Sequence, residues 1–243
     1  MRIRGDNHKI DYKDTKGFFE NRAKKYNTQN PYSVTMYQDK NAKLVEMRNR
    51  AEIEKLLPLI QFDENSRILD IACGIGRWAD AIGDSMQSYV GVDFSKELIR
   101  IARERNTNPK ASFLVGSVTE LNGILTSEQT FNRVLMIGIM VYLNDDDISA
   151  FTSVVERHCE PGTLICMREP VGIETRLTLK DFYSDELEDN YNAIYRTREE
   201  LISLISPALL EKGFSIVREG YLFEKAGLNN RAETSQYYFI LKR

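Results

Sequence analysis

The sequence predicts an α/β protein with a doubly wound, mostly parallel sheet of seven strands and an antiparallel last strand. Short apolar runs of strand length alternate with segments of helical periodicity, which is typical of parallel strands joined by crossover helices. The last two predicted strands have no helix between them, so they should pair antiparallel at the sheet edge. We also expect a helical N-terminal lid and an insertion after the fifth strand.

Length and composition fit one domain with a lid. The chain has 243 residues, of which 42% are hydrophobic and 28% charged, enough to bury a sizeable core. No apolar run approaches the roughly 20 residues of a membrane span, and the first residues lack the apolar centre of a secretion signal. We therefore expect a cytoplasmic protein with no membrane partner. The three cysteines lack CxxC spacing and there are only two histidines, so we expect no metal site.

Charge is distributed unevenly along the chain. The first 50 residues hold 12 Lys and Arg against 6 Asp and Glu, and the remainder holds 21 against 30. A nucleic-acid partner would favour basic residues over the whole body, so this pattern argues against one. It fits a small anionic group bound near the basic arm, or equally a solvated arm without a ligand. The composition leaves the oligomeric state open.

Residues 1–57 are predicted to form a helical arm and lid, and residues 58–243 the main domain. Apolar positions in residues 41–57 lie on one side of a helix, which Pro58 helps to end. Strands are then expected at residues 67–72, 89–92, 112–115, 133–137 and 163–167. Helices are expected at residues 78–82, 96–104 and 145–159, the second of them capped by Ser95.

Residues 171–196 break this alternation with charged, tyrosine-rich sequence, and we interpret them as an insertion over the site. Thr197 and Glu200 form a capping box for a helix that runs to about residue 210 and is ended by Gly213. The last two strands are expected at residues 215–222 and 236–241. Ligands bind such sheets at the carboxyl ends of the parallel strands, so we expect the site there.

The most informative stretch is RILDIACGIGRWAD, where a strand ends at Asp70 and runs through Gly74 and Gly76 into a helix. Asp93 ends the next strand, where a carboxylate can accept both hydroxyls of an adenosine ribose, and Phe94 offers an apolar face for adenine. The same pattern fits a dinucleotide site, so a nicotinamide-dependent oxidoreductase is an alternative. Asp70 would repel a pyrophosphate but suits an ammonium group, which favours a methionine-containing cofactor.

From Leu56 to Arg243 the chain resembles the class I S-adenosylmethionine-dependent methyltransferases, through DIACGIG, VGVDFS and SQYYFILKR. The resemblance implies that S-adenosylmethionine is the cofactor and that Asp93 holds its ribose. It places the methionine part of the cofactor against Asp70, Ala72, Gly74 and Gly76. The acidic residue common after the third strand of the family is Ser117 here, so the Ser117 hydroxyl or the Val118 backbone would contact the adenine.

The upstream segment YQDKNAKLVEMRN is similar to the lid of small bacterial methyltransferases of surface-polysaccharide pathways. This similarity implies that Tyr37 and Arg48 close over the cofactor, with Arg48 on its carboxylate. The alternative for Arg48 is a surface position on an amphipathic helix.

The sequence also indicates where a methyl acceptor would bind. Tyr142 and Glu169, which follow strands four and five, are the catalytic candidates, with Glu169 as the first choice for a general base. A structural carboxylate paired to Arg168 or Arg176 is the alternative for Glu169. The substrate-binding candidates are Arg168, Tyr183, Tyr195 and Arg196.

Together these features predict methyl transfer to an oxygen or nitrogen of a small, possibly anionic metabolite, such as a sugar or a phosphorylated intermediate. A base is needed only for a neutral acceptor, and the scarcity of histidine with the basic arm favours an anionic one. An RNA or protein methyltransferase is a further alternative, although it would usually carry a basic body or a recognition domain.

Overall fold

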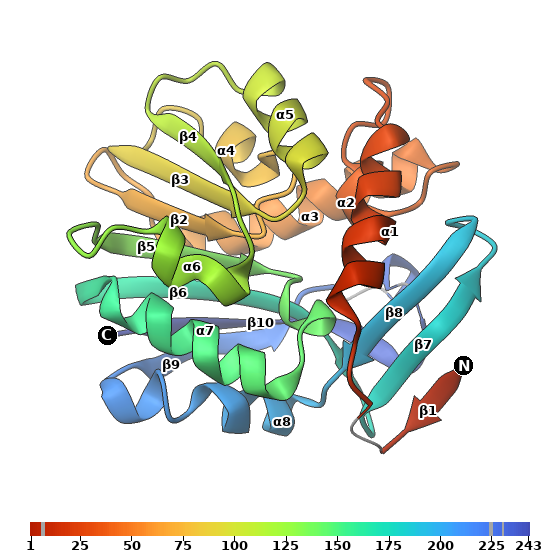
Figure 1. The fold of residues 1–243 in the computed structure, drawn as a ribbon. Helices are drawn as coiled ribbons and strands as arrows, with labels where there is room; N and C mark the ends of the chain where they lie inside the picture. The colour runs from red at the N-terminus through yellow and green to blue at the C-terminus, as the bar shows by residue number, and fades with distance from the viewer. Residues whose placement is uncertain (6–7, 224–225, 230) are drawn as a thin grey trace.

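The computed structural model describes residues 1–5, 8–223, 226–229 and 231–243 (Figure 1). Its main feature is a seven-stranded sheet in the order β4-β3-β2-β5-β6-β10-β9. The strands are β2 (Arg67–Ile71), β3 (Ser88–Asp93), β4 (Ala111–Val115), β5 (Phe131–Ile137), β6 (Cys159–Gly172), β9 (Ser215–Tyr221) and β10 (Thr234–Lys242). β2 to β6 are parallel, and β10 pairs antiparallel with both β6 and β9. The predicted fold class is confirmed.

Helices cover both faces of this sheet (Figure 1). One face packs against α3 (Ala42–Ile60), α4 (Arg77–Ile82) and α5 (Lys96–Arg105). The other packs against α6 (Leu121–Ile124), α7 (Asp145–Arg157) and α8 (Arg198–Ile205). Short 3-10 helices are η1 (Val118–Glu120), η2 (Met140–Tyr142), η3 (Leu210–Lys212) and η4 (Ala226–Leu228). The central strands, such as β2, are buried on both sides, which explains their continuous apolar runs, whereas the edge strand β9 has no buried residue.

Two helix caps form at the positions that the sequence predicts. The Ser95 side chain accepts from the Leu98 amide at the start of α5, and Thr197 with Glu200 forms the capping box of α8. Two helix ends differ from expectation. α3 continues past Pro58 to Ile60, because a proline in the last turn removes only one backbone hydrogen bond. α8 ends at Ile205 rather than near residue 210, and η3 follows before Gly213.

The N-terminal arm differs most from the prediction. It begins with a strand, β1 (Arg2–Arg4), before α1 (Tyr12–Lys24) and α2 (Ser33–Met36). β1 pairs antiparallel with β7 (Leu177–Ser184), which pairs with β8 (Asp189–Tyr195), so the insertion is a hairpin in a second sheet. Phe18 and Phe19 of α1 pack with the hairpin and with Leu98 and Val141 of the main domain in a shared core. The arm and the hairpin therefore lie together beside the end of the large sheet (Figure 1).

Candidate functional site

A cavity of about 1080 Å³, including space open to solvent, lies at the carboxyl ends of the parallel strands. The loops after β2, β3 and β5 form its floor, and α1, α2 and β8 form its roof. One side is formed by α3, β6 and the start of β10. The sequence candidates that line it are Tyr37, Arg48, Ala72, Gly74, Asp93, Phe94, Tyr142, Arg168 and Tyr195. The fold thus gathers residues from both halves of the chain at one place.

The glycine loop is shaped by left-handed backbone and by contact with the arm. Ala72, Gly74 and Gly76 all have positive φ, at 59°, 56° and 76°. A Cβ on Gly74 would come within 2.7 Å of Thr35 Cγ2 in α2, closer than side chains tolerate. Only glycine therefore lets α2 rest on this loop.

Asp93 is buried, with 5% of its surface exposed, yet it lines the cavity. Its carboxylate accepts hydrogen bonds from the Gly74 amide at 3.0 Å and the Ser95 amide at 2.9 Å. Burial raises its pKa to about 6, although both amides act in the opposite direction. Asp93 thus fixes the glycine loop to the end of β3 and presents a carboxylate to a ligand beside Phe94.

Asp70 lies behind the loop rather than in the large cavity. It lines an adjoining cavity of about 380 Å³ together with Thr35, Arg77, Trp78 and Arg168. Its carboxylate accepts a hydrogen bond from the Tyr89 hydroxyl, and burial raises its pKa to about 7. The Trp78 Nε1 atom is buried there without a hydrogen-bond partner. This small polar cavity adjoins the side of the glycine loop where a charged ligand group would need partners.

Four tyrosines form a chain of hydroxyl groups in the roof of the cavity. Tyr37 contacts Tyr142, Tyr142 lies 3.1 Å from Tyr191, and Tyr191 lies 3.2 Å from Tyr195, measured between hydroxyl oxygens. All four side chains line the cavity. Burial raises the pKa of Tyr37 to about 12 and the pKa values of Tyr142 and Tyr191 well above the usual range. These phenols therefore stay protonated near neutral pH and act through hydrogen bonds.

The opposite wall of the cavity is charged. Arg48 of α3 is buried and donates from Nε to the Leu228 carbonyl at 2.8 Å. Arg168 of β6 places Nε 2.9 Å from a Glu52 oxygen and donates from Nη1 to the Gln236 side chain at 3.1 Å. Glu52 also pairs with Arg77. Burial alone would raise the pKa of Glu52, but the two arginines outweigh it and lower this pKa, so Glu52 is ionised.

Comparison with known proteins assigns this region to a type of domain. Residues 68–162, from β2 to the start of β6, match the family described as methyltransferase domain. This part of the chain is therefore similar to a methyltransferase domain.

Curated relatives of this methyltransferase domain act on different molecules, as their names state. Cyclopropane-fatty-acyl-phospholipid synthase of Escherichia coli (strain K12) is 26% identical over 131 residues, covering 54% of this chain and 32% of the relative. Phosphoethanolamine N-methyltransferase 1 of Caenorhabditis elegans is 25% identical over 140 residues, with coverages of 57% and 28%. The 23S rRNA (uracil(1939)-C(5))-methyltransferase RlmD of Stenotrophomonas maltophilia (strain R551-3) is 29% identical over 132 residues, with coverages of 51% and 29%. The chain spans about a third of the length of these relatives.

Solved structures share the fold over nearly the whole chain. The DhpI–SAH complex has a TM-score of 0.65 at 15% identity and covers 94% of this chain and 95% of that one. Phosphoethanolamine N-methyltransferase 1 of Haemonchus contortus, in complex with phosphoethanolamine and S-adenosylhomocysteine, has a TM-score of 0.66 at 18% identity, with coverages of 93% and 49%. These structures show that the fold is shared, and the domain match supports S-adenosylmethionine as the cofactor.

Glu169, the first candidate for a general base, does not line the cavity of the methyltransferase domain. Its buried carboxylate accepts three backbone hydrogen bonds, from the amides of Ile139 at 2.9 Å, Met140 at 3.0 Å and Val141 at 3.2 Å. Burial raises its pKa to about 7, and the amides oppose this shift. The carboxylate therefore holds η2, which carries cavity residues, and its geometry favours this structural duty over proton transfer.

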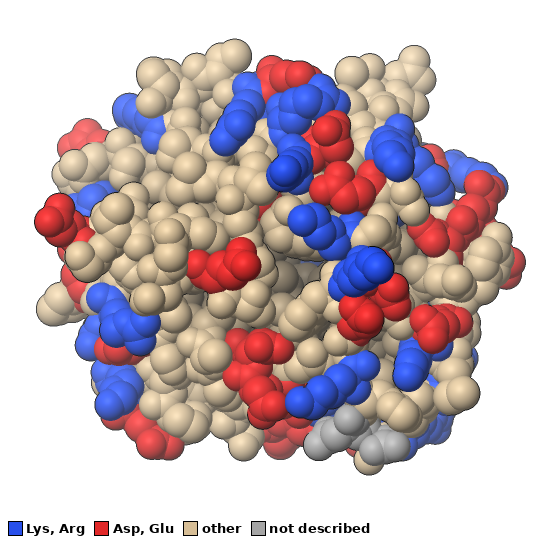
Figure 2. All heavy atoms as spheres, viewed as in Figure 1, with Lys and Arg blue, Asp and Glu red and all other residues tan. Residues whose placement is uncertain are grey.

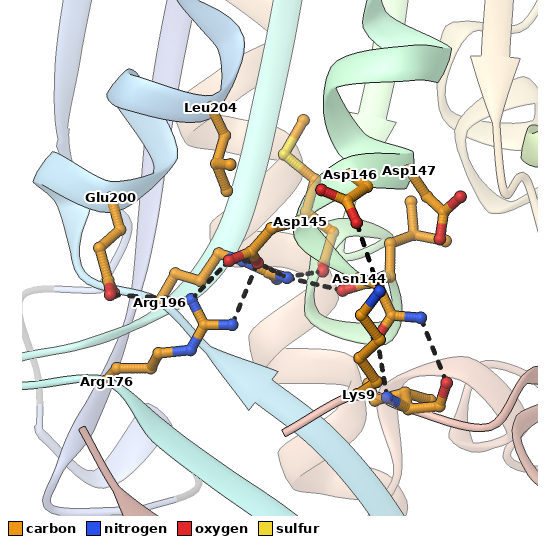
Figure 3. Close-up of polar contacts among 12 residues, drawn as sticks. Lys9, Asn144, Asp145, Asp146, Asp147, Arg176, Arg196, Glu200 and Leu204 are labelled. Atoms are coloured by element: carbon orange, nitrogen blue, oxygen red, sulfur yellow. Dashed lines mark hydrogen bonds and ion pairs between the residues drawn. The ribbon is translucent and has the colours of Figure 1, made fainter. Parts of the chain in front are cut away.

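Arg196 and Tyr183 also lie outside the cavity. Arg196 is buried and donates to the carbonyls of Met140 at 2.7 Å and Leu143 at 2.6 Å, and to Asp145 at 2.7 Å. Figure 3 shows Arg176 and Arg196 converging on Asp145 at the start of α7. All three guanidinium nitrogens of Arg196 donate to the protein, and the side chain does not line the cavity. Tyr183 is 58% exposed on the outer part of β7.

Ser117 and Val118 begin η1 at the end of β4, and neither lines the cavity. They lie beside the Asp93 strand, because the Gly116 amide donates to the Asp93 carbonyl at 2.9 Å.

Several cavity residues were missed by sequence reasoning. They include Phe19, Thr35, Glu52, Tyr191, Asn229 and Gln236. Two had a usable signal: Glu52 follows Arg48 by one helical turn, and Tyr191 shares a strand face with Tyr195. The others come from distant segments. In the described part of the chain, no group of three His, Cys, Asp or Glu side chains is placed to hold a metal ion. Within the same ranges, no helix has the length and apolar character needed to cross a membrane.

Proposed function

We propose that the chain binds S-adenosylmethionine in the large cavity and transfers its methyl group to an oxygen or nitrogen of a small metabolite. The observation that carries this proposal is the joint position of Asp93 and Gly74. They are hydrogen-bonded at 3.0 Å and both face the cavity that holds the tyrosine chain and the arginines. A cofactor site and an acceptor site therefore share one enclosed space.

The cofactor end of the cavity offers a partner for each part of the cofactor. Asp93 would accept the ribose hydroxyls, and Phe94 would lie against the adenine, with Ser117 and Val118 near its edge. Ala72 and Gly74 line the cavity and would place their backbone beside the methionine part, whereas Gly76 lines neither cavity and packs against Phe113. Asp70 and Arg77, in the adjoining small cavity, would meet the ammonium and the carboxylate of that part.

The cofactor supplies an electrophilic methyl group, so the chain must hold the acceptor in line with it and exclude water. Tyr37 and Tyr142 are placed for both tasks, because they cover the cavity and link α2 to η2 through their hydroxyls. Three contacts join four hydroxyl groups in the tyrosine chain, which leaves one O–H free to donate. We assign this donor to the acceptor, as an orienting hydrogen bond.

A small acceptor is favoured over a macromolecular one. The cavity is roofed by the arm and the hairpin, which leaves space for a metabolite rather than an open groove. On the face drawn in Figure 2, the described acidic and basic side chains are intermixed and form no continuous basic surface. A relative and a solved structure named as phosphoethanolamine methyltransferases also fit a small acceptor, whereas RlmD supports the RNA alternative. Sugars remain within the proposed class.

Calorimetric titration with S-adenosylmethionine and with NAD tests this proposal. We expect binding of the first and none of the second. Asp93→Asn should weaken binding about 10- to 100-fold, since hydrogen bonds to a charged group contribute about 1.5–3 kcal/mol. Asp185→Asn, which changes an exposed turn residue, is the matched control and should bind like wild type. Unchanged affinity in Asp93→Asn, or preferential NAD binding, would contradict the proposal.

A further inference from the structure

The charged wall of the cavity holds more positive than negative charge. Arg48 and Glu52 lie one turn apart on α3, and both line the cavity. Glu52 is shared between Arg77 and Arg168, so it balances only one of these two cations. Arg48 has a neutral partner, the Leu228 carbonyl. The wall of the large cavity therefore contains two guanidinium groups, Arg48 and Arg168, and one carboxylate, Glu52. Arg77 also uses Glu52, from the adjoining small cavity, so the wall keeps an excess of positive charge.

Among the described residues Arg48 has no ion-pair partner, whereas Arg168 pairs with Glu52. Arg48 is only 5% exposed, and no described acidic group lies within ion-pair distance of it. Burial lowers its pKa, and Glu186 opposes this effect only from a distance. Among the described residues, its two terminal nitrogens meet no hydrogen-bond acceptor. A buried cation is unfavourable unless it is paired, so we expect a bound anion to supply the partner for the Arg48 guanidinium.

Neutral polar groups hold the rim of the same wall in place. The Gln236 side chain accepts from Arg168 Nη1 at 3.1 Å. The backbone amide of Gln236 donates to Asn229 Oδ1 at 3.1 Å, and Asn229 Nδ2 donates to Ser235 Oγ at 3.2 Å. Arg48 is attached to the neighbouring residue Leu228. Leu228 of η4 thus fixes Arg48, and Gln236 of β10 fixes Arg168, before any ligand binds, which reduces the ordering cost of binding.

We propose that Arg48 and Arg168 form a subsite for the anionic group of the methyl acceptor, and that this group is a phosphate monoester. The proposal rests on the proposed function and names its acceptor class. A phosphate monoester carries nearly two negative charges at neutral pH and several acceptor oxygens, so it can meet both Arg48 and Arg168. Guanidinium groups bind phosphate oxygens in pairs, a geometry that a single surface lysine would not supply.

This assignment replaces the expectation that Arg48 binds the carboxylate of the cofactor. The glycine loop adjoins the small cavity, which contains Arg77, already paired with Glu52, and the Trp78 Nε1 atom, which has no partner among the described residues. A cofactor carboxylate would meet these two groups there. Arg48 instead lies against Leu228, beside the start of β10. The carboxylate of the cofactor and the phosphate of the acceptor would therefore have separate partners, at different ends of the site.

The test uses the whole protein saturated with S-adenosylhomocysteine and titrated calorimetrically with methyl phosphate at about pH 7.5, where a monoester is doubly charged because its second pKa is about 6. Methyl sulfate, which has the same shape and one charge, is the comparison. We expect wild type to bind methyl phosphate at least about tenfold more tightly than methyl sulfate. Arg48→Gln should weaken methyl phosphate about tenfold or more and leave S-adenosylhomocysteine within about twofold.

Arg50→Gln is the control, because Arg50 lies on the same helix with 69% of its side chain exposed. It should bind both ligands like wild type. Arg48→Lys, which keeps the charge but loses the paired geometry, should give an intermediate affinity for methyl phosphate. Loss of S-adenosylhomocysteine binding in Arg48→Gln would show that Arg48 contacts the cofactor, and it would overturn the proposed subsite. Undetectable methyl phosphate binding by wild type, or equal binding by Arg48→Gln, would also overturn it. If wild type fails to bind S-adenosylhomocysteine, the proposed function itself fails.

Discussion

Replacing Glu169 by glutamine should destabilise the fold, because the carboxylate holds three backbone amides in a buried place. Oε1 accepts from Ile139 and Met140, and Oε2 accepts from Val141. A glutamine amide keeps one acceptor oxygen but turns a donor toward the third amide. One charge-assisted hydrogen bond is lost and one buried N–H is left unsatisfied, so we expect the free energy of unfolding to fall by about 1.5–3 kcal/mol.

Urea denaturation followed by circular dichroism measures this loss. The control is Glu128→Gln, at an exposed position between α6 and β5, which should stay within about 0.5 kcal/mol of wild type. Glu169→Ala should cost more than Glu169→Gln, since all three amides then lose their acceptor. A Glu169→Gln variant as stable as wild type would refute this reasoning and restore Glu169 as a candidate base.

Three further outcomes are expected. Affinity for S-adenosylmethionine should fall as the pH drops below about 6, since the Asp93 carboxylate must be ionised to accept two hydroxyls; titration should show at least roughly tenfold weaker binding at about pH 5 than at pH 7.5. Asp93→Asn should lose the part of this dependence that belongs to Asp93 and keep the part that belongs to Asp70, whose pKa is raised to about 7 by burial. Tyr142→Phe should lower the free energy of unfolding by about 1–2 kcal/mol. The double variant with Tyr191→Phe should lose less than the sum of the two single variants, because both hydroxyls belong to one hydrogen-bond network; additive losses would argue against this network. Gln38→Gly should raise the melting temperature, because Gln38 has a φ of 66° that glycine adopts without strain, whereas Gln38→Ala should not.

The large sheet could be predicted because its signals are local. Each parallel strand is a short apolar run followed by a turn or a cap, so residues such as Ser95 and Gly83 mark boundaries without knowledge of the fold. β1 could not be found in this way. It has three residues, and its partner β7 lies about 170 positions away, so only tertiary contact makes it a strand.

The same distinction applies to the site. The residues from Asp70 to Gly76 lie in one contiguous motif, and Asp93 follows at a recognisable distance, so the cofactor end was accessible to sequence reasoning. The charged wall was accessible only in part, since Glu52, Arg168 and Gln236 come from α3, β6 and β10. Arg168 and Arg196 looked equivalent as candidates. What separates them is the supply of nearby acceptors, which the sequence does not reveal.

Two residues that the sequence suggested for the substrate or the chemistry instead fix the loop that carries Tyr142. Glu169 accepts hydrogen bonds from the backbone amides at the start of η2, and Arg196 donates to the carbonyls of Met140 and Leu143. The two side chains therefore fix both the N–H and the C=O groups of this loop. Arg196 is itself held by Asp145, whose pKa is lowered because Arg176 and Arg196 outweigh the effect of burial (Figure 3). Methyl transfer depends on alignment more than on a strong base, so charged groups that immobilise the cavity wall contribute to the reaction without touching the acceptor.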